Sequence, residues 1–423
     1  MTTNQDYIFE DYFIDKPQKA IHYFWLGFII NTVSYTLMII TNSPSKIFIL
    51  LQFIGIVIFV LPAIQLIRLK IENKYLASLY VIYFIWSFVI VARGFSLNKD
   101  YLINLVVDSS GGIFLYLAPL ILLFPRNLAF IATIFNAIII LSIFFLLFLF
   151  IFSGDLIGED SENGQRIIEY FAKILSIPAG FILLTNTYQS SKRNLFSIVI
   201  ILLTFSLAVI RARRGLMFMS LNIIAFSFVF YFFTNKGNLA KRFIPLVLLP
   251  IVLLYTVQFY QDNKTDTFSN ISERLDEDTR SGVVAFFVMD MSVDDWIIGK
   301  GINGEYFCPV SEESNSNYRN VIETDYLQII LKGGIVSLAI LLLIAIPAVV
   351  KGLFYSNNIL SKASGLWILF WLINMYPTSV TNFNINYLIV WICIGICYSP
   401  EIRRLPEDSV KEFFRSNGSK LLG

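Results

Sequence analysis

The sequence predicts an all-α, polytopic integral membrane protein with about twelve transmembrane helices and one large outer loop. Of its 423 residues, 56% are hydrophobic and only 15% are charged, and the mean hydropathy is +0.69. Soluble domains have about a quarter charged residues. The apolar residues are gathered in runs close to the length of about 20 that a helix needs to cross a membrane. We therefore treat residues 1–423 as a single membrane domain, with residues 261–325 as a loop inserted between spans nine and ten.

A scan with a window of that length gives twelve candidate spans. They are Tyr23–Ile40, Ile47–Ile67, Tyr75–Ala92, Gly111–Phe124, Leu128–Phe152, Tyr170–Tyr188, Leu195–Ile210, Gly215–Phe233, Phe243–Tyr260, Tyr326–Val350, Gly365–Tyr376 and Tyr387–Tyr398. The fourth span follows the interruption "DSSGG" (108–112), and the last two are short. An error of one span is expected at these places.

Composition excludes several kinds of site and partner. The net charge of +2 is too small to indicate a nucleic-acid partner. Cys308, Cys393 and Cys397 have no spacing typical of a metal site, and His22 is the only histidine. Four acidic residues precede the first span, which is unlike a cleavable signal peptide, so we expect that span to be retained.

Basic residues predict the orientation of the chain, because Lys and Arg are enriched in cytoplasmic connections. If the N-terminus is inside and the spans alternate, more basic residues fall on the inside than on the outside, and both ends are cytoplasmic. The stretch "IRARRGLMF" (210–218) is the exception, because it places Arg211, Arg213 and Arg214 in an outside turn between spans seven and eight.

Two interpretations of these arginines remain open. They can extend to lipid phosphates of the outer leaflet, as long basic side chains do near membrane surfaces. Alternatively they form an anion site, since guanidinium forks suit phosphate oxygens better than ammonium groups do. If the turn is helical, Arg211 and Arg214 share a face and Arg213 points elsewhere. A lipid-linked pyrophosphate is an anion found at that depth.

The long outer loop contains an apolar helix and a glycine-rich turn. "RSGVVAFFVMDM" (280–291) predicts a helix that lies on the membrane or caps a cavity. The glycines of "GKGING" formally match a dinucleotide-binding motif, but no βαβ unit surrounds them, so we expect Gly299 and Gly301 to form a tight structural turn. The acidic run "DEDT" (276–279) is more typical of a solvated segment than of a cation site.

Lys332 lies inside the tenth expected span. A charge within a span is a candidate functional residue by default, although this side chain can also extend to the outer surface.

The chain resembles the bacterial O-antigen ligase/polymerase family of polytopic glycosyltransferases, whose members act on undecaprenyl-pyrophosphate-linked glycans. "ARRGLMFMSL" (212–221) is similar to the Ser-Arg-Gly motif that opens a span in that family, with Arg214 in the arginine position and Arg213 in place of the usual small polar residue. "RSGVVAFFVMDMSVDDWIIGKGINGEYF" (280–307) resembles a loop segment in which an arginine begins a helix that leads to a Gly-x-Gly turn. This correspondence assigns Arg280 to the arginine of that segment.

A third similarity covers "ETDYLQIILKGGIVSL" (323–338), where ligases have His-Asn followed by Tyr-Leu and a later glycine. Together with the number of spans and the single large outer loop, the three segments extend the resemblance over most of the chain. Where ligases place the histidine that activates the acceptor, this sequence has Glu323, with Asp325 two residues later. The acidic residues favour the polymerase branch, whose members join repeat units into O-antigen, capsule or exopolysaccharide.

The resemblance implies a reaction and residue roles. Arg214 and Arg280, assisted by Arg211, would bind the pyrophosphate and stabilise the charge that develops as the glycosidic bond breaks. Lys332, as a charge within a span, is a further candidate for binding the pyrophosphate. Glu323 or Asp325 would act as general base toward the acceptor hydroxyl. The resemblance implies no metal, no cofactor and no nucleotide sugar. The simpler interpretations are a capped helix start for both carboxylates and an ion pair with the acidic run for Arg280.

The resemblance also implies a location and partners. The protein would be a multi-pass protein of the bacterial inner membrane with its active site facing the periplasm, and it would contact membrane lipids, undecaprenyl-pyrophosphate-linked oligosaccharides as donor and acceptor, a chain-length regulator and a flippase. Three alternatives stay open: a ligase that transfers glycan to a lipid A core, a flippase for lipid-linked oligosaccharides, and a non-catalytic scaffold. The missing histidine disfavours the ligase, and the scarcity of charges within spans disfavours the flippase.

Overall fold

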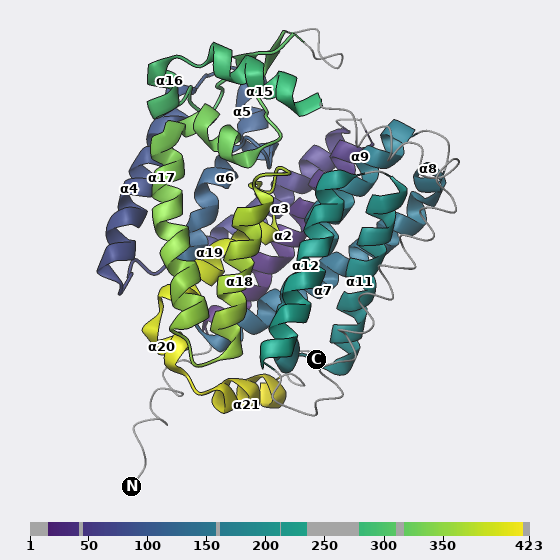
Figure 1. Cartoon of the computed structure of the whole chain (residues 1–423), viewed down its shortest axis with the longest axis vertical. Helices are drawn as coiled ribbons and strands as arrows, with labels where there is room; N and C mark the ends of the chain where they lie inside the picture. Colours follow the sequence, from purple (N-terminus) through teal and green to yellow (C-terminus); the bar gives the residue numbers. More distant parts are fainter. Residues whose placement is uncertain are drawn as a thin grey trace.

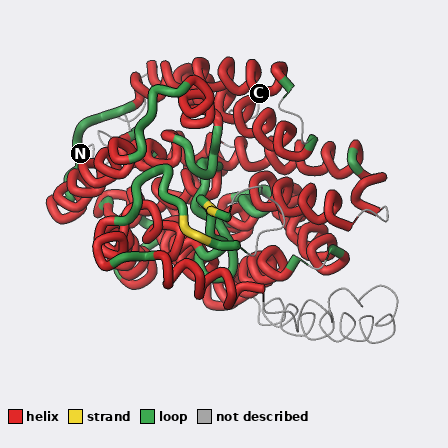
Figure 2. The backbone as a smooth tube through the Cα atoms, turned by 90° about the horizontal axis from the view of Figure 1, so that it is seen from above, coloured by secondary structure: helices red, strands yellow, loops and turns green. Residues whose placement is uncertain are grey.

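The computed structural model describes residues 16–41, 45–157, 161–211, 213–234, 279–309 and 317–417. Most of these residues are helical (Figures 1 and 2), and the strands among them form one two-stranded antiparallel sheet in which Tyr306 pairs with Arg319.

The first half of the described chain contains long helices joined by short helical turns. They are α2 (Lys16–Ile40), α3 (Lys46–Leu66), α4 (Lys74–Arg93), α5 (Lys99–Val107), α6 (Ile113–Leu117), η1 (Ala118–Leu123), α7 (Leu128–Ile151), α8 (Ser153–Ile157), α9 (Ser161–Phe171), η2 (Ala172–Ser176), α10 (Ala179–Leu184), η3 (Asn186–Tyr188), α11 (Ser191–Ile210) and α12 (Arg214–Thr234). The second half contains α15 (Thr279–Asp290), α16 (Val293–Ile298), β1 (Tyr306–Phe307), β2 (Tyr318–Arg319), α17 (Asp325–Phe354), α18 (Ile359–Asn374), α19 (Ile385–Tyr398), α20 (Pro400–Arg404) and α21 (Glu407–Asn417).

Eight helical segments in the described ranges are long and apolar enough to cross a membrane. They fall on eight of the expected spans: α2, α3, α4, α7, the segment Ile167–Leu184, α11, α12 and α17. Shorter apolar helices, among them Ile113–Leu123, α18 and α19, fall on the three expected spans that were short. The chain is therefore an all-α protein of multi-pass membrane character. The expected ninth span, Phe243–Tyr260, lies outside the described residues, and the count of twelve stays a prediction.

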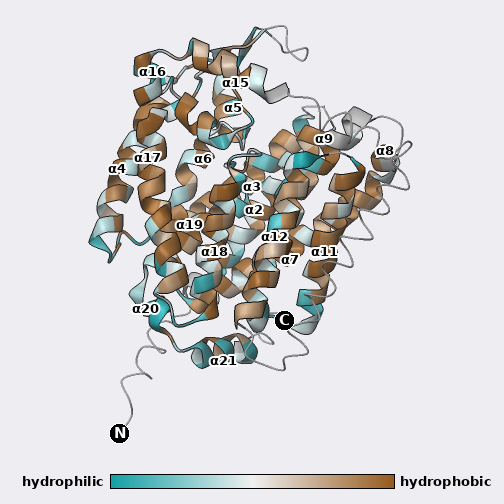
Figure 3. Ribbon diagram, viewed as in Figure 1, coloured by the Kyte–Doolittle hydropathy of each residue, from teal (hydrophilic) through white to brown (hydrophobic). Residues whose placement is uncertain are grey.

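The connections of the bundle separate into two ends. Helices α20 and α21 lie at the lower end of Figure 1. Arg126 Nη2 donates to the Lys70 carbonyl over 2.9 Å, and the Arg126 side chain lies beside Gly395, near the end of α19 that leads to α20. At the same end, Asn358 Nδ2 donates to the carbonyl of Ile402 over 2.7 Å. These segments are the ones expected inside. Hydropathy follows the same division, with apolar residues along the long helices and hydrophilic residues gathered on α20 and α21 (Figure 3).

The opposite end gathers the segments that were expected outside. There Asn303 Nδ2 donates to the Gly94 carbonyl over 2.6 Å, and the Phe383 amide donates to the carbonyl of Ser109 over 2.7 Å. The expected alternation thus agrees with the arrangement of the connections. Which end faces the cytoplasm, and with it the inner-membrane location, stays a prediction.

The centre of the bundle is formed by α7, α10, α18 and α19. Every residue of α19 is buried, which fits a helix that is apolar on all sides. By contrast, α3 and α4 expose large apolar side chains such as Ile64, Ile85 and Phe88, as expected where helices face lipid.

The described part of the long loop, expected outside, forms a small module around one aromatic centre. Phe287 of α15 is fully buried, and its ring lies 5.5 Å from the ring of Tyr306 and 5.7 Å from that of Trp296. The apolar face of α15 therefore forms the core of the module, rather than a surface that lies wholly on the membrane.

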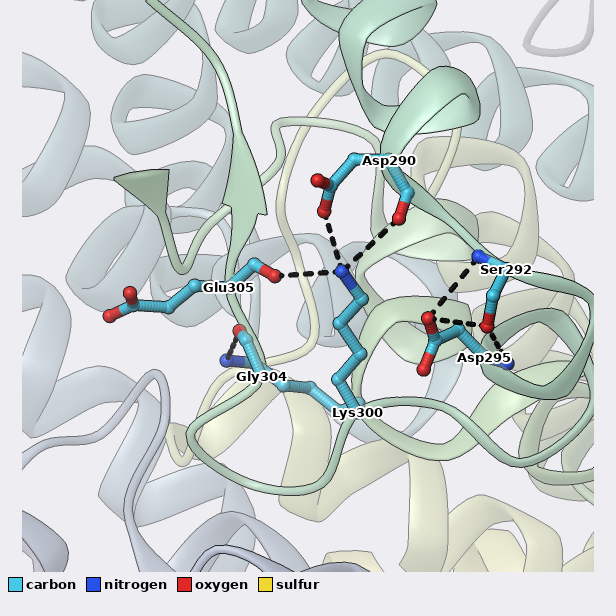
Figure 4. Close-up of polar contacts among 7 residues, drawn as sticks. Asp290, Ser292, Asp295, Lys300, Gly304 and Glu305 are labelled. Atoms are coloured by element: carbon cyan, nitrogen blue, oxygen red, sulfur yellow. Dashed lines mark hydrogen bonds and ion pairs between the residues drawn. The ribbon is translucent and has the colours of Figure 1, made fainter. Parts of the chain in front are cut away.

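Polar contacts close the same module (Figure 4). Ser292 and Asp295 form a capping box at the start of α16. Lys300 Nζ lies 2.5 Å from Asp290 Oδ2 and donates to the Glu305 carbonyl over 3.2 Å. The ammonium group thus joins the end of α15 to the strand that follows the glycine turn.

Candidate functional site

A cavity of about 750 Å³ lies at the end of the bundle that was expected outside. We call it the arginine cavity. Its charged lining consists of Lys173, Arg213, Arg214, Glu169 and Glu323. Three cations and two carboxylates from three distant parts of the sequence therefore face one space. Such an excess of cations suits an anionic ligand.

Two of these cations share one carboxylate. The Lys173 ammonium pairs with Glu169 Oε1, and Arg213 Nη2 lies 3.3 Å from Glu169 Oε2. All three side chains are partly buried, between 16% and 30% exposed. The pairs are therefore less screened than pairs on an open surface.

The backbone at Lys173 is irregular. Residues Ala172–Ser176 form a π-helical turn in which the Ile177 amide donates to the Ala172 carbonyl, five residues earlier. Asn386 Nδ2 donates to the Lys173 carbonyl over 2.6 Å and ties this turn to the start of α19. Turns of this type occur frequently at functional sites, and here the turn sets the point from which Lys173 reaches the cavity.

Part of the lining of the arginine cavity consists of buried apolar side chains. It includes Leu216, Met219, Trp367, Phe370 and Trp371. Trp371 is only 3% exposed, and its indole nitrogen has no hydrogen-bond partner among the described residues. The cavity thus combines partly exposed charged groups with buried apolar side chains, which fits an amphipathic anion better than a free inorganic one.

The loop between α18 and α19 supplies further polar groups to the lining. Thr378, Ser379, Asn382, Asn384 and Asn386 line the cavity from this loop and the first turn of α19. Hydroxyl and amide groups can donate and accept, so they can contact the hydroxyl groups of a sugar as well as oxygen atoms of an anion.

Asp325 holds that loop in place. Its carboxylate Oδ2 accepts from the amides of Val380 and Thr381, each over 2.6 Å, and its own amide donates to the Met375 carbonyl over 2.9 Å. Asp325 is fully buried and is not among the residues that line the arginine cavity. Its contacts are those of a residue that positions the loop, whereas the expectation for Asp325 was a catalytic or capping role.

Glu323, by contrast, is exposed and lines the cavity together with Arg213 and Arg214. Burial raises the pKa of the neighbouring Tyr306 to about 12, and the Glu323 charge contributes in the same direction. Tyr306 therefore keeps its proton at neutral pH; it lies in the core of the loop module and does not line the cavity, whereas Glu323 does. The only histidine, His22, lies in α2 and lines neither cavity described here.

The arginines of the 210–218 turn do not have the arrangement expected of a continuous helix. Helix α11 ends at Ile210 and α12 begins at Arg214. Arg211 donates from Nη2 to the carbonyls of Asp155 and Leu156. The turn is thus not helical, which was the condition for a shared face of Arg211 and Arg214. Arg211 contacts the α8 segment, while Arg213 and Arg214 line the cavity. The side chain of Arg280, at the start of α15, lies outside the described residues.

A second cavity of about 470 Å³ adjoins the first. We call it the lysine cavity, because Lys332 lines it together with Asp108 and several tyrosines. The two cavities share lining residues, namely Tyr35, Ser110, Val321, Ser379 and Asn382. Lys332 is 8% exposed, and its ammonium donates to the Gly304 carbonyl over 2.9 Å. Lys332 thus belongs to the second cavity and not to the group around Arg214.

Backbone contacts of the glycine turn shape the lysine cavity. Gly299 and Gly301 have φ of 71° and 83°, and Gly334 interrupts α17 with φ 68° and ψ −178°. The amides of Lys300 and Gly301 donate to the carbonyls of Leu331 and Lys332 over 2.7 and 2.9 Å. A side chain at Gly299 would place its Cβ 2.5 Å from the Gly333 amide nitrogen, so glycine is needed for this close approach.

Arg93 fixes the other side of the glycine turn. Its guanidinium donates to the carbonyls of Ile298 and Gly299 over 2.8 and 2.7 Å. Trp86 Nε1 donates to the Gly333 carbonyl over 2.9 Å. The turn therefore connects the end of α4 to the interruption in α17, and it does not resemble a nucleotide-binding loop.

Several lining residues were not expected from the sequence. Glu169, Tyr170 and the asparagines of 382–386 carried no family motif, and Arg213 was expected to point away. Two signals were nevertheless present: Lys173 is a charge within an apolar segment, and "TNFNINY" (381–387) repeats asparagine at every second position. In the described ranges, no group of three His, Cys, Asp or Glu side chains is arranged to hold a metal ion.

Comparisons of the chain with family models, with curated proteins and with solved structures found no match.

Proposed function

We propose that this protein is a glycosyltransferase that joins undecaprenyl-pyrophosphate-linked repeat units of O-antigen, capsule or exopolysaccharide at the outer face of the cytoplasmic membrane. The observation that carries the proposal is the arginine cavity, where Arg213 and Arg214 share a lining with Glu323. These residues come from two of the three segments on which the family resemblance rests. A cavity that combines cations with buried apolar side chains supports binding of a pyrophosphate attached to a polyprenyl chain.

In the proposed reaction, a hydroxyl group of the acceptor sugar attacks C1 of the donor glycan. The bond between C1 and the pyrophosphate oxygen breaks, and its electron pair leaves with the undecaprenyl pyrophosphate. Arg213 and Arg214 stabilise the negative charge that develops on that oxygen. Glu323 accepts the proton of the attacking hydroxyl group. A single displacement of this kind inverts the anomeric centre.

The asparagines and hydroxyl groups of 378–386 orient the sugars near the breaking bond, and Asp325 positions the loop that presents them. The reaction uses groups of the chain itself and needs no nucleotide sugar, since the donor already has a good leaving group. The proposed partners are the lipid-linked donor and acceptor, the surrounding lipids, and a flippase and chain-length regulator that act before and alongside polymerisation.

Deletion of the gene in its host bacterium tests the proposal. We expect surface glycan of a single repeat unit in place of a ladder of lengths, with the ladder restored by the wild-type gene but not by a Glu323→Gln variant that inserts normally. A gel of extracted glycan provides the measurement.

The same deletion strain separates the alternative functions when the carrier lipid and the side of the membrane on which glycan accumulates are also measured. Polymer that accumulates on its carrier lipid without transfer to a lipid A core would indicate a ligase. Repeat units that accumulate on the cytoplasmic side of the membrane would indicate a flippase. An unchanged ladder in the deletion strain would contradict all three functions.

A further inference from the structure

Glu169 is placed between two cations of the arginine cavity. Its Oε1 pairs with the Lys173 ammonium, and its Oε2 lies 3.3 Å from Arg213 Nη2. The family resemblance assigns no role to Glu169 or to Lys173. All three side chains line the same cavity as Arg214 and Glu323. The site proposed to bind pyrophosphate therefore already contains an anion provided by the chain.

The two cations are attached to fixed backbone. Lys173 lies in the π-helical turn that Asn386 ties to α19, and Asn386 is itself largely buried. The Arg213 amide donates to the Ala208 carbonyl over 2.9 Å, directly before α12 begins. Both cations thus extend from fixed backbone toward the same carboxylate. Like charges this close repel, and the repulsion is strong where water is scarce, so an anion between them stabilises the arrangement.

A carboxylate and a phosphoryl group offer the same contact to such a pair of cations. Each presents two oxygens that can meet an ammonium group on one side and a guanidinium group on the other. A diphosphate carries more negative charge than a carboxylate and has further oxygens for Arg214. It can therefore compete for the place that Glu169 occupies.

We infer that Lys173 and Arg213 bind one phosphoryl group of the diphosphate ligand, and that Glu169 occupies the position of that group while the ligand is absent. The inference rests on the proposed function for the identity of the ligand. On binding, the Glu169 carboxylate leaves the two cations, and the phosphoryl oxygens take its contacts. Glu169 is then a residue that sets the affinity of the site, and Lys173 is a ligand-binding residue.

Inorganic pyrophosphate serves as the probe in a titration of the full chain in detergent at fixed ionic strength. Glu169→Gln keeps the size of the side chain but removes the competing charge. We therefore expect this variant to bind pyrophosphate about fivefold more tightly than the wild type does. Lys173→Met should bind it about tenfold more weakly. Glu412→Gln in α21 is the matched control, because it makes the same substitution at the opposite end of the bundle and Glu412 does not line the arginine cavity. Its affinity should change less than about twofold.

Equal or weaker binding of pyrophosphate by Glu169→Gln would overturn the inference, because Glu169 would then orient the cations and not stand in for the ligand. Undetectable binding by every variant would overturn it as well. If Glu169→Gln does not fold, Glu169→Asp replaces it. The shorter aspartate side chain cannot reach both cations, so this variant should also bind pyrophosphate more tightly than the wild type. The proposed function fails by a different measurement, namely the absence of glycan bonds formed by the purified wild-type protein on lipid-linked repeats.

Discussion

The arginine cavity and the lysine cavity share a wall but are built from different parts of the chain. In the arginine cavity, charged side chains from separate helices face one another, and Glu169 pairs with both Lys173 and Arg213. In the lysine cavity, the cation Lys332 is buried and donates to the Gly304 carbonyl. The turns that shape its wall depend on glycine, as at Gly334.

The difference shows that the partner of a cation decides whether the cation can bind a ligand or has a structural role. A cation paired with a side-chain carboxylate can exchange that partner for a ligand, because the carboxylate can turn away. A cation bonded to a backbone carbonyl cannot exchange it without moving the chain, and the unpaired carbonyl would lose a hydrogen bond. We therefore expect the arginine cavity to bind the anion, and Lys332 to stabilise the wall of the lysine cavity.

Glu323→Gln should have the largest effect on activity. If Glu323 accepts the hydroxyl proton, turnover falls by roughly 10²–10⁴-fold while lipid-linked repeat still binds, since glutamine keeps the shape but not the basicity. Purified protein assayed on lipid-linked repeats measures the rate. The comparison variant is Asp325→Asn, which should mainly lower thermal stability because the loop at Val380 loses a charged acceptor. Normal turnover in Glu323→Gln with a folded but inactive Asp325→Asn would transfer the role to Asp325.

Gly334→Ala tests whether backbone geometry shapes the lysine cavity. Its φ of 68° and ψ of −178° lie in a region that only glycine adopts readily, and an added Cβ would lie 2.0 Å from the Ile297 carbonyl oxygen. We expect a loss of about 3 kcal/mol in the free energy of unfolding. Gly282→Ala in α15 is the control, because its Cβ would meet nothing within 4 Å, and it should be neutral or slightly stabilising. Equal denaturation midpoints for the two variants would contradict the comparison.

Arg214→Lys tests the opposite property, the chemistry of side chains in the arginine cavity. Lysine keeps the charge but loses the fork that holds two phosphate oxygens, so we expect roughly a tenfold to hundredfold loss of turnover with normal insertion. Arg213→Lys should be affected similarly, because the structure places both side chains at the cavity. Arg126→Lys, at the other end of the bundle, is the control and should stay within about twofold of the wild type. Full activity of Arg214→Lys would reduce the site to general electrostatic attraction.

Lys332→Met should have the smallest effect on anion binding. The apolar side chain fills a similar volume and gives up the bond to the Gly304 carbonyl, so stability falls by about 1 kcal/mol. Affinity for inorganic pyrophosphate should change less than about threefold, since the ammonium lines the other cavity. A loss as large as that of Lys173→Met would show that the two cavities act as one site.

The all-α membrane class could be predicted because it follows from local composition. Runs such as Leu128–Ile151 are apolar enough to require a helix in hydrocarbon, where every backbone group must be paired within its own segment. The family resemblance also directed attention to Arg214 and Glu323, which the fold brings to one cavity. The need for glycine at 299 and 301 could be inferred from the turn sequence alone.

Contacts between distant segments could not be predicted in this way. Nothing local distinguishes Arg211, which bonds to the carbonyls of α8, from Arg213, which faces Glu169. Asp325 and Glu323 are two residues apart and chemically similar, yet one is buried beneath Val380 and the other is exposed at the cavity.

The sequence by itself determined the class of the fold, the positions of most of its long helices and the types of residue available for chemistry, because these depend on the hydropathy and conformational preferences of short stretches. Only the tertiary structure decided which charges meet, as for Lys173 and Glu169 with Arg213. The physical reason is that the partner of a charged side chain depends on where helices distant in sequence begin and end, and those positions are set by packing of the whole bundle.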